Sequence, residues 1–312
     1  MRNPIAILCS DLHLSLQQPA CRADKDWMTI QHDYLIQLKE LAGGLPIVCA
    51  GDIFDRWNTP AELINFALDN LPNDMICIPG QHDLPEHRHD QVDRSGYGVL
   101  VKAGKIIDLQ RQDGNRYQSD FVIIGFGWGE NIRSVHPDDL NDEDDNRVIL
   151  AVLHRYVWLN EETRYPGAPE ECGLGPLKKA LKTYDAVVIG DNHKGWLRKK
   201  GGDMPNTEVF NCGTFIRRKS DEIDYRPAVG ILHSDGTIER HFLDTSIDRF
   251  HEDAKKREEV AVNMKDFIEG LEGLGEHGFN FREAVEQHLR KDEFDKETKE
   301  IILQALEGDN KA

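Results

Sequence analysis

Aspartate and histidine residues gather in five short clusters in the first two-thirds of the chain. The clusters are Ser10-Asp11-Leu12-His13, Gly51-Asp52-Ile53-Phe54-Asp55, Pro79-Gly80-Gln81-His82-Asp83, the single His154, and Gly190-Asp191-Asn192-His193. Oxygen and nitrogen ligands without cysteine suit divalent ions such as Mn²⁺, Fe²⁺ or Zn²⁺. Because a carboxylate shared by two such ions builds a hydrolytic site, the clusters indicate metal-dependent hydrolysis.

Each cluster directly follows one of six short apolar runs whose length and β-branched content are typical of buried strands. The runs are residues 5–9, 47–50, 75–78, 121–124, 148–153 and 186–189. Helical patterns over residues 26–41 and 59–71 separate the first three runs, which predicts parallel strands joined by right-handed crossovers. Since the carboxyl ends of parallel strands meet at one edge, we expect the clusters to converge on one crevice.

Taken singly, each clustered residue has an ordinary structural explanation. An aspartate after a strand usually caps a helix or stabilises a turn, and a lone histidine is more often a hydrogen-bonded structural residue than a ligand. Capping alone does not explain five such clusters in this order, each at the end of a predicted strand. We therefore interpret the set as one site.

The composition limits the class of protein. A chain of 312 residues that is 39% hydrophobic and 30% charged has room for one large α/β domain and is not globally disordered. The net charge of −18 argues against a protein that coats nucleic acid, although a local basic patch could still bind it. No apolar stretch reaches membrane-spanning length and the chain opens on a strand-like run. We therefore expect a cytoplasmic protein that does not bind a membrane.

The last part of the chain predicts a different organisation. Residues 229–233 and 237–242 flank a Ser-Asp-Gly turn and predict a β-hairpin. From residue 246 onward the pattern is that of charged amphipathic helices, in which 18 acidic residues outnumber 11 basic ones. We therefore predict a main domain over residues 1–245 and an acidic helical appendage over residues 246–312. The appendage would pack on the main domain, dock a protein partner or repel non-cognate DNA.

The order of the clusters, D-x-H, G-D-x-x-D, G-x-H-D, H and G-x-x-H, resembles the calcineurin-like metallophosphoesterase superfamily. Ser-Asp-Leu-His-Leu and Gly-Asp-Ile-Phe-Asp are most similar to the SbcD-type DNA repair nucleases, as are Asp83-Leu84-Pro85 and Asn211-Cys212-Gly213-Thr214. The resemblance implies the metallo-dependent phosphatase-like α/β fold. This fold is a four-layer α-β-β-α sandwich, in which helices flank two sheets.

The resemblance also implies how two divalent metal ions would be held and used. Asp11, His13 and His193 would hold the first ion, and Asp52 would bridge it to the second. A hydroxide between the ions would attack phosphorus in line, and the ions would stabilise the added negative charge. The reaction implied is hydrolysis of a phosphoester without a covalent nucleophile.

His154, Gln81 and Asp191 would bind the second ion, and two of them depart from the family pattern. Gln81 stands where the family has asparagine and is one methylene longer, and Asp191 replaces a histidine. An anionic oxygen in place of a neutral nitrogen favours a harder ion. We therefore expect Mn²⁺ at a modified but working site, with Mg²⁺, Fe²⁺ and Zn²⁺ as alternatives.

The resemblance gives the third cluster a role in acid–base chemistry. His82 would bind no metal ion but would contact the substrate phosphate or protonate the leaving oxygen, with Asp83 orienting it. Near neutral pH a histidine can face a phosphate as a cation and still lose a proton, which suits this role.

Basic residues downstream of the last cluster are candidates for binding substrate. Lys194, Arg198, Arg217 and Arg218 could form a rim for a nucleic-acid backbone, or could simply belong to solvated turns. Together with the resemblance, the rim favours an SbcD-like nuclease that hydrolyses DNA phosphodiester bonds, by endonuclease or exonuclease action. The resemblance suggests an SMC-like ATPase as partner, and a homodimer is left open.

Two other functions stay open at this point. The same chemistry could act on small nucleotides, cyclic phosphodiesters or phosphoproteins, which the acidic net charge favours. Alternatively, loss of the second ion through Gln81 and Asp191 would leave a non-catalytic interaction module on the same fold. Metal content separates the two, since two bound ions per chain support catalysis and none supports the module.

Overall fold

The computed structural model describes residues 2–112, 115–118, 120–136 and 147–257. In its first sheet, of order β12-β11-β1-β2-β3-β4, strands β1 to β4 run parallel, while β11 and β12 are antiparallel to their neighbours. The strands are β1 (Pro4–Cys9), β2 (Ile47–Cys49), β3 (Met75–Cys77), β4 (Ile106–Asp108), β11 (Ala228–His233) and β12 (Ile238–Phe242). The predicted hairpin is confirmed as β11 and β12.

The second sheet has the order β5-β6-β7-β8-β10-β9, and its centre is formed by the parallel strands β6, β7, β8 and β10. The strands are β5 (Asn115–Tyr117), β6 (Phe121–Phe126), β7 (Val148–His154), β8 (Ala186–Gly190), β9 (Trp196–Arg198) and β10 (Glu208–Asn211). The six strands predicted from the apolar runs are therefore confirmed, three of them in each sheet.

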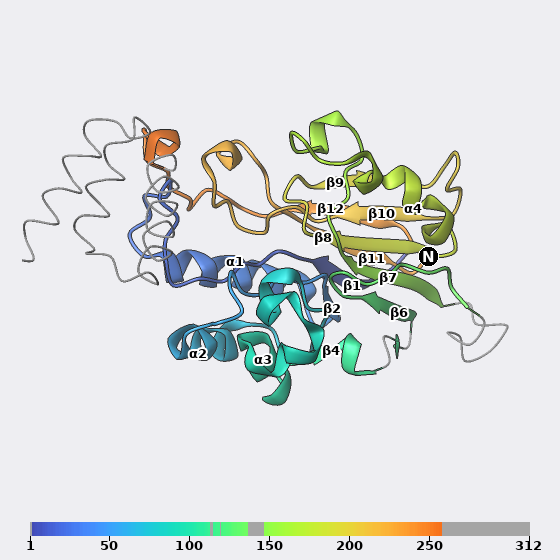
Figure 1. Ribbon diagram of the computed structural model, residues 1–312, viewed down its shortest axis with the longest axis horizontal. Helices are drawn as coiled ribbons and strands as arrows, with labels where there is room; N and C mark the ends of the chain where they lie inside the picture. The colour runs from blue at the N-terminus through green and yellow to red at the C-terminus, as the bar shows by residue number, and fades with distance from the viewer. Residues whose placement is uncertain (1, 113–114, 119, 137–146, 258–312) are drawn as a thin grey trace, which may run out of the picture. The chain divides into compact units, whose positions relative to one another are not determined.

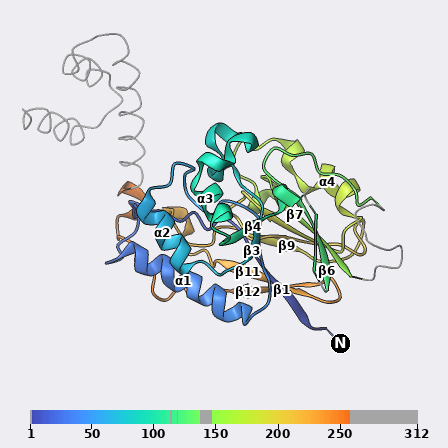
Figure 2. The same cartoon turned by 90° about the horizontal axis from the view of Figure 1, so that it is seen from below.

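Helices cover the outer faces of both sheets. The α-helices of the described residues are α1 (Trp27–Ala42), α2 (Ala61–Asn70), α3 (Gly96–Lys102) and α4 (Leu174–Leu181). The first three pack on the first sheet and α4 packs on the second (Figure 1; Figure 2). In β1, whose side chains alternate between faces, Ile7 and Cys9 pack among the helices, whereas Ala6 and Leu8 pack between the sheets. The four-layer α-β-β-α sandwich is confirmed.

Local sequence signals explain where α1 begins and ends. The Asp26 carboxylate accepts a hydrogen bond from Met28 N at 3.0 Å, and Gly43 leaves the helix with a φ of 54°. The 3₁₀ turns of the described residues are η1 (Gln81–Asp83), η2 (Pro85–His87), η3 (His89–Arg94), η4 (Leu109–Gln112), η6 (Glu161–Thr163), η7 (Glu170–Cys172) and η8 (Ser220–Glu222).

The chain divides into two compact units. The first comprises residues 1–18, 24–217 and 224–248 and holds both sheets, and the second comprises residues 19–23, 218–223 and 249–312. Within the second unit, Ala23 N donates a hydrogen bond to Arg249 O at 2.9 Å. Residues 258–312, most of the predicted acidic appendage, lie outside the described residues, so its helical structure stays a prediction. Within the described ranges, no helix is both long and apolar enough to cross a bilayer.

Candidate metal centre

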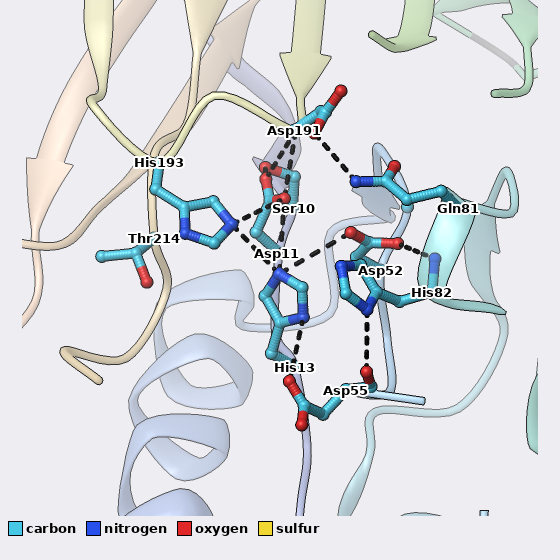
Figure 3. Close-up of polar contacts among 12 residues, drawn as sticks. Ser10, Asp11, His13, Asp52, Asp55, Gln81, His82, Asp191, His193 and Thr214 are labelled. Atoms are coloured by element: carbon cyan, nitrogen blue, oxygen red, sulfur yellow. Dashed lines mark hydrogen bonds and ion pairs between the residues drawn. The ribbon is translucent and has the colours of Figure 1, made fainter. Parts of the chain in front are cut away.

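The predicted clusters meet at the carboxyl ends of parallel strands from both sheets, and Figure 3 shows four of the five side by side. In the first sheet, Asp11 and His13 follow β1, Asp52 follows β2, and Gln81 and His82 follow β3. In the second sheet, His154 ends β7, and Asp191 and His193 follow β8. Three sets of donor atoms each lie within 4.8 Å of one another, namely Asp11-His13-His193, Asp11-Asp52-His154 and His13-Asp52-His82. The convergence of the clusters on one site is therefore confirmed.

Asp11, His13 and His193 form the first group of donors. The Nε2 atoms of His13 and His193 lie 3.1 Å apart, and Asp11 Oδ1 lies 3.8 and 3.7 Å from them. Metal–ligand bonds of about 2.0–2.2 Å place two ligand atoms of one ion roughly 3.0–3.6 Å apart. Small movements of these side chains would therefore place one divalent ion among all three.

Asp52 lies between the two groups of donors. Its Oδ2 atom lies 3.6 Å from His13 Nε2 and 3.4 Å from His154 Nε2, while Oδ1 accepts a hydrogen bond from His82 N at 3.0 Å. Oδ2 is buried and has no hydrogen-bond partner among the described residues, a costly state that a cation would relieve. Burial opposes ionisation, yet His154 and His13 lower the pKa of Asp52, so it is poised as an anion.

His154 and Gln81 form the second group together with Asp191. His154 Nδ1 lies 2.5 Å from Ala50 O, which fixes the ring and directs Nε2 into the site, 2.6 Å from Gln81 Oε1. Gln81 Nε2 in turn donates to Asp191 Oδ1 at 2.9 Å. Burial lowers the pKa of His154, but the negative charges of Asp52 and Asp11 outweigh this effect, so the pKa is raised to well above its ordinary value. The site therefore concentrates negative charge around this imidazole.

The backbone at the site adopts a conformation that most residues avoid. Asp11, His13, Asp52 and Asp191 have φ values of 53°, 44°, 56° and 84°, in the left-handed region. Such conformations persist where the surrounding structure holds them, and they concentrate at functional sites. The four residues come directly after buried strands, so the sheets hold these turns in place.

Two glycines allow the loops to approach one another closely. A Cβ on Gly51 would collide with the His154 ring, and one on Gly80 would collide with the Asp52 carboxylate. Gly51 also has a φ of 93°, which an L-residue rarely adopts. The glycines that precede Asp52 and Gln81 in the sequence are therefore steric requirements of the site.

His82 is held by the second cluster. Its Nδ1 lies 2.8 Å from Asp55 O, and its ring lies edge-on to that of His13 with centroids 4.9 Å apart (Figure 3). With Nδ1 bound to a carbonyl, Nε2 is the nitrogen that remains for substrate. Sequence reasoning did not assign Asp55 this role, although the motif G-D-x-x-D contains it.

The Asp83 side chain has different hydrogen-bond partners from the one expected. Its buried carboxylate accepts hydrogen bonds from the backbone N–H groups of Ile53, Phe54 and Gly80 at 3.3, 3.2 and 3.0 Å. Burial raises the pKa of Asp83 to about 8. The expectation that Asp83 orients His82 is corrected, because it instead ties the loop after β2 to the loop after β3.

The four basic residues predicted to bind substrate have different surroundings in the structure. Lys194 Nζ donates to Arg164 O at 3.1 Å beside the His193 loop, but Arg198 forms an ion pair with Asp203 at 2.9 Å. Arg217 Nε contacts buried Asp248 at 2.7 Å, with 11% of the arginine side chain exposed. Arg218 belongs to the second compact unit. Ion pairs with aspartates occupy the guanidinium groups of Arg198 and Arg217, and the substrate-binding role of the four basic residues stays a prediction.

The segment 211–214 positions the loop that carries His193. Asn211 Nδ2 donates to Asn192 O at 2.6 Å and Lys194 O at 3.2 Å, and Thr214 N donates to His193 O at 3.0 Å. The segment 211–214 therefore fixes the backbone on both sides of the candidate ligand His193.

Comparison with known proteins gives the family of this chain. The family model of calcineurin-like phosphoesterases matches residues 6–195, which include all seven candidate metal ligands. The chain belongs to the calcineurin-like phosphoesterase family, whose members hydrolyse phosphoesters with the help of metal ions. A comparison with curated proteins gives no match.

Solved structures also resemble this chain, at low sequence identity. A metallophosphoesterase from Sphaerobacter thermophilus is 13% identical, with 78% of this chain and 89% of that chain covered and a TM-score of 0.36. A dimetal phosphatase from Danio rerio is 12% identical, with 73% and 93% covered and a TM-score of 0.39.

Proposed function

We propose that the protein is a metal-dependent phosphodiesterase that cleaves DNA, in the manner of the SbcD-type nucleases its motifs resemble. The observation that carries the phosphodiesterase proposal is the position of Asp52 Oδ2, which is buried, lacks a hydrogen bond among the described residues and faces both His13 and His154. A carboxylate so placed fits a ligand shared between two cations.

The donor set fits two divalent ions. Asp11, His13 and His193 would hold one, His154, Gln81 and Asp191 the other, and Asp52 would contact both. When bound, the ions would supply Lewis acidity to the phosphoryl oxygens and lower the pKa of water. The oxygen donors of Gln81 and Asp191 favour Mn²⁺ or Mg²⁺ over Zn²⁺ at the second position.

His82 supplies the proton in this proposal. As the bond between phosphorus and the leaving oxygen breaks, Nε2 of the imidazolium donates its proton to that oxygen. The carbonyl of Asp55 keeps the proton on Nδ1 and so holds the ring in a fixed orientation throughout. Asp83 acts at a distance by holding the loops that carry Asp52 and His82.

DNA is proposed as substrate because the motif Gly51-Asp52-Ile53-Phe54-Asp55 resembles that of the SbcD-type nucleases. The net charge of −18 instead favours a small phosphodiester. A panel of DNA, cyclic nucleotides and an aryl phosphodiester, assayed with Mn²⁺, Mg²⁺ and Zn²⁺, separates the two. We expect Mn²⁺-dependent cleavage of DNA that is lost in His82→Ala while metal content is unchanged. Turnover of the aryl phosphodiester without DNA cleavage would defeat the nuclease assignment. An SMC-like ATPase partner, a homodimer and a cytoplasmic location stay predictions.

A further inference from the structure

A pocket of about 240 Å³ lies between the loops that follow β1 and β2, with a lining drawn from residues 14–17 and 55–63. We call it the loop pocket. Asp55 connects it to the candidate metal centre, because its carbonyl holds His82 and its Oδ1 lies 3.8 Å from His13 Nδ1. A group bound in this pocket would therefore lie on the side of the site where His82 releases its proton.

The lining combines an apolar wall with a polar rim. Leu14 and Leu63 are buried and form part of the wall, while Asn58 is exposed at the rim. Ligand pockets typically combine an apolar lining with a few polar groups that fix the orientation of the ligand. A nucleobase has this combination, with apolar faces and hydrogen-bonding edges.

Arg56 adds a charge at the same rim. Its side chain is exposed and forms no hydrogen bond, ion pair or ring contact among the described residues, unlike those of Arg198 and Arg217. A guanidinium binds phosphate through two parallel hydrogen bonds. In a chain with a net charge of −18, a cation without an acidic partner beside the candidate site indicates an anionic ligand.

We propose that the loop pocket receives the nucleoside on the leaving side of the cleaved bond, and that Arg56 binds the next phosphate along the strand. This inference rests on the proposed function, and it narrows the substrate to a polynucleotide with at least one phosphate beyond the cleaved one. Arg56 is thus a specificity residue, and it has no part in the bond-breaking step.

Two substrates test this subsite. Arg56→Ala should raise KM for a short single-stranded DNA about tenfold, and change turnover of an aryl phosphodiester, which has a single phosphate, less than about twofold. Arg56→Lys should recover part of the loss, because lysine keeps the charge without the paired hydrogen bonds. Asn58→Trp places a large side chain in the pocket, and it should likewise raise KM for the DNA without changing turnover of the aryl phosphodiester.

Arg2→Ala is the charge control, because Arg2 precedes β1 and lies at the end of the strand opposite Asp11, where it pairs with Glu239 at 3.5 Å. It removes the same charge, so a general loss of attraction for DNA would show there too.

A binding measurement completes the test without relying on turnover. In the His82→Ala background, fluorescence anisotropy with labelled DNA should show about tenfold weaker binding when Arg56→Ala is added. Equal losses on both substrates, equal losses in Arg56→Ala and Arg2→Ala, or unchanged DNA binding would overturn the subsite. Failure of the metal-loaded wild-type protein to cleave DNA, whether or not it turns over the aryl phosphodiester, would instead overturn the proposed function, and with it this inference.

Discussion

The side-chain amide of Gln81 donates a hydrogen bond to the carboxylate of Asp191 at 2.9 Å, and so joins the two positions where this chain departs from its family's motif. The remaining atom of the amide, Oε1, faces His154 Nε2 at 2.6 Å. An asparagine would be one methylene too short for both contacts, and a histidine at position 191 would offer no carboxylate. The two departures are therefore coupled parts of one modified site.

This coupling predicts a non-additive effect on metal binding. Gln81→Asn and Asp191→His should each weaken binding of the second Mn²⁺ by about tenfold, since each breaks the contact between the two side chains. The double variant should lose less affinity for Mn²⁺ than the two single variants lose together. It should bind Zn²⁺ more tightly than the wild-type protein, because it replaces an oxygen donor by a nitrogen. Isothermal titration calorimetry with each metal measures both effects, and additive losses would contradict the coupling.

The close approach of Gly80 to Asp52 predicts a local steric effect. Gly80→Ala should reduce the free energy of unfolding by about 1–3 kcal/mol, because the added methyl group displaces the Asp52 carboxylate. It should also weaken metal binding. Gly175→Ala in α4 is the control, since among the described residues no atom beyond its chain neighbours and its own helix backbone lies within 4 Å of its Cβ position, and it should be neutral or slightly stabilising. Urea unfolding compares the two, and equal effects would refute the steric explanation.

The buried pair of Arg217 and Asp248 predicts a structural effect where the sequence suggested substrate binding. Arg217→Ala should cost about 3–5 kcal/mol of stability, because it leaves a buried carboxylate without its arginine. Arg198→Ala breaks a more exposed pair with Asp203 and should cost about 0–1 kcal/mol. Thermal and urea unfolding provide the comparison. A stable Arg217→Ala protein with impaired DNA binding would instead support the prediction that Arg217 binds substrate.

Asp108 at the end of β4 predicts a pH effect on stability away from the metal centre. Burial raises its pKa, so the fold favours the neutral form. Its contribution is complete below the pKa of the unfolded chain and decreases as pH rises through the elevated value. Asp108→Asn should therefore become more stable relative to wild type between pH 4 and pH 8. Urea unfolding in chelator at both pH values tests this, and a constant difference would contradict it.

Much of the site could be predicted from sequence because its signals are local. Asp11, Asp52 and His154 follow apolar runs that can hardly form anything but buried strands, so their convergence follows from parallel topology. The division of those strands between two sheets came from the family resemblance, since periodicity alone does not separate one parallel sheet from two.

What sequence could not supply depends on contacts between distant segments or on backbone atoms. Arg217 meets Asp248 only after the chain has crossed two strands. The partner of His82 is the carbonyl of Asp55, and a carbonyl carries no signal in the residue type. Asp83 follows a histidine in a catalytic motif, yet its turn directs the carboxylate to three backbone N–H groups.

The central claim is that Asp52 is shared by two metal ions, and metal analysis after reconstitution with Mn²⁺ tests it most directly. We expect about two ions per wild-type chain and a clear loss in Asp52→Ala, whose fold is checked by circular dichroism. One ion or none in the wild-type protein, or an unchanged content in a folded Asp52→Ala protein, would contradict the claim.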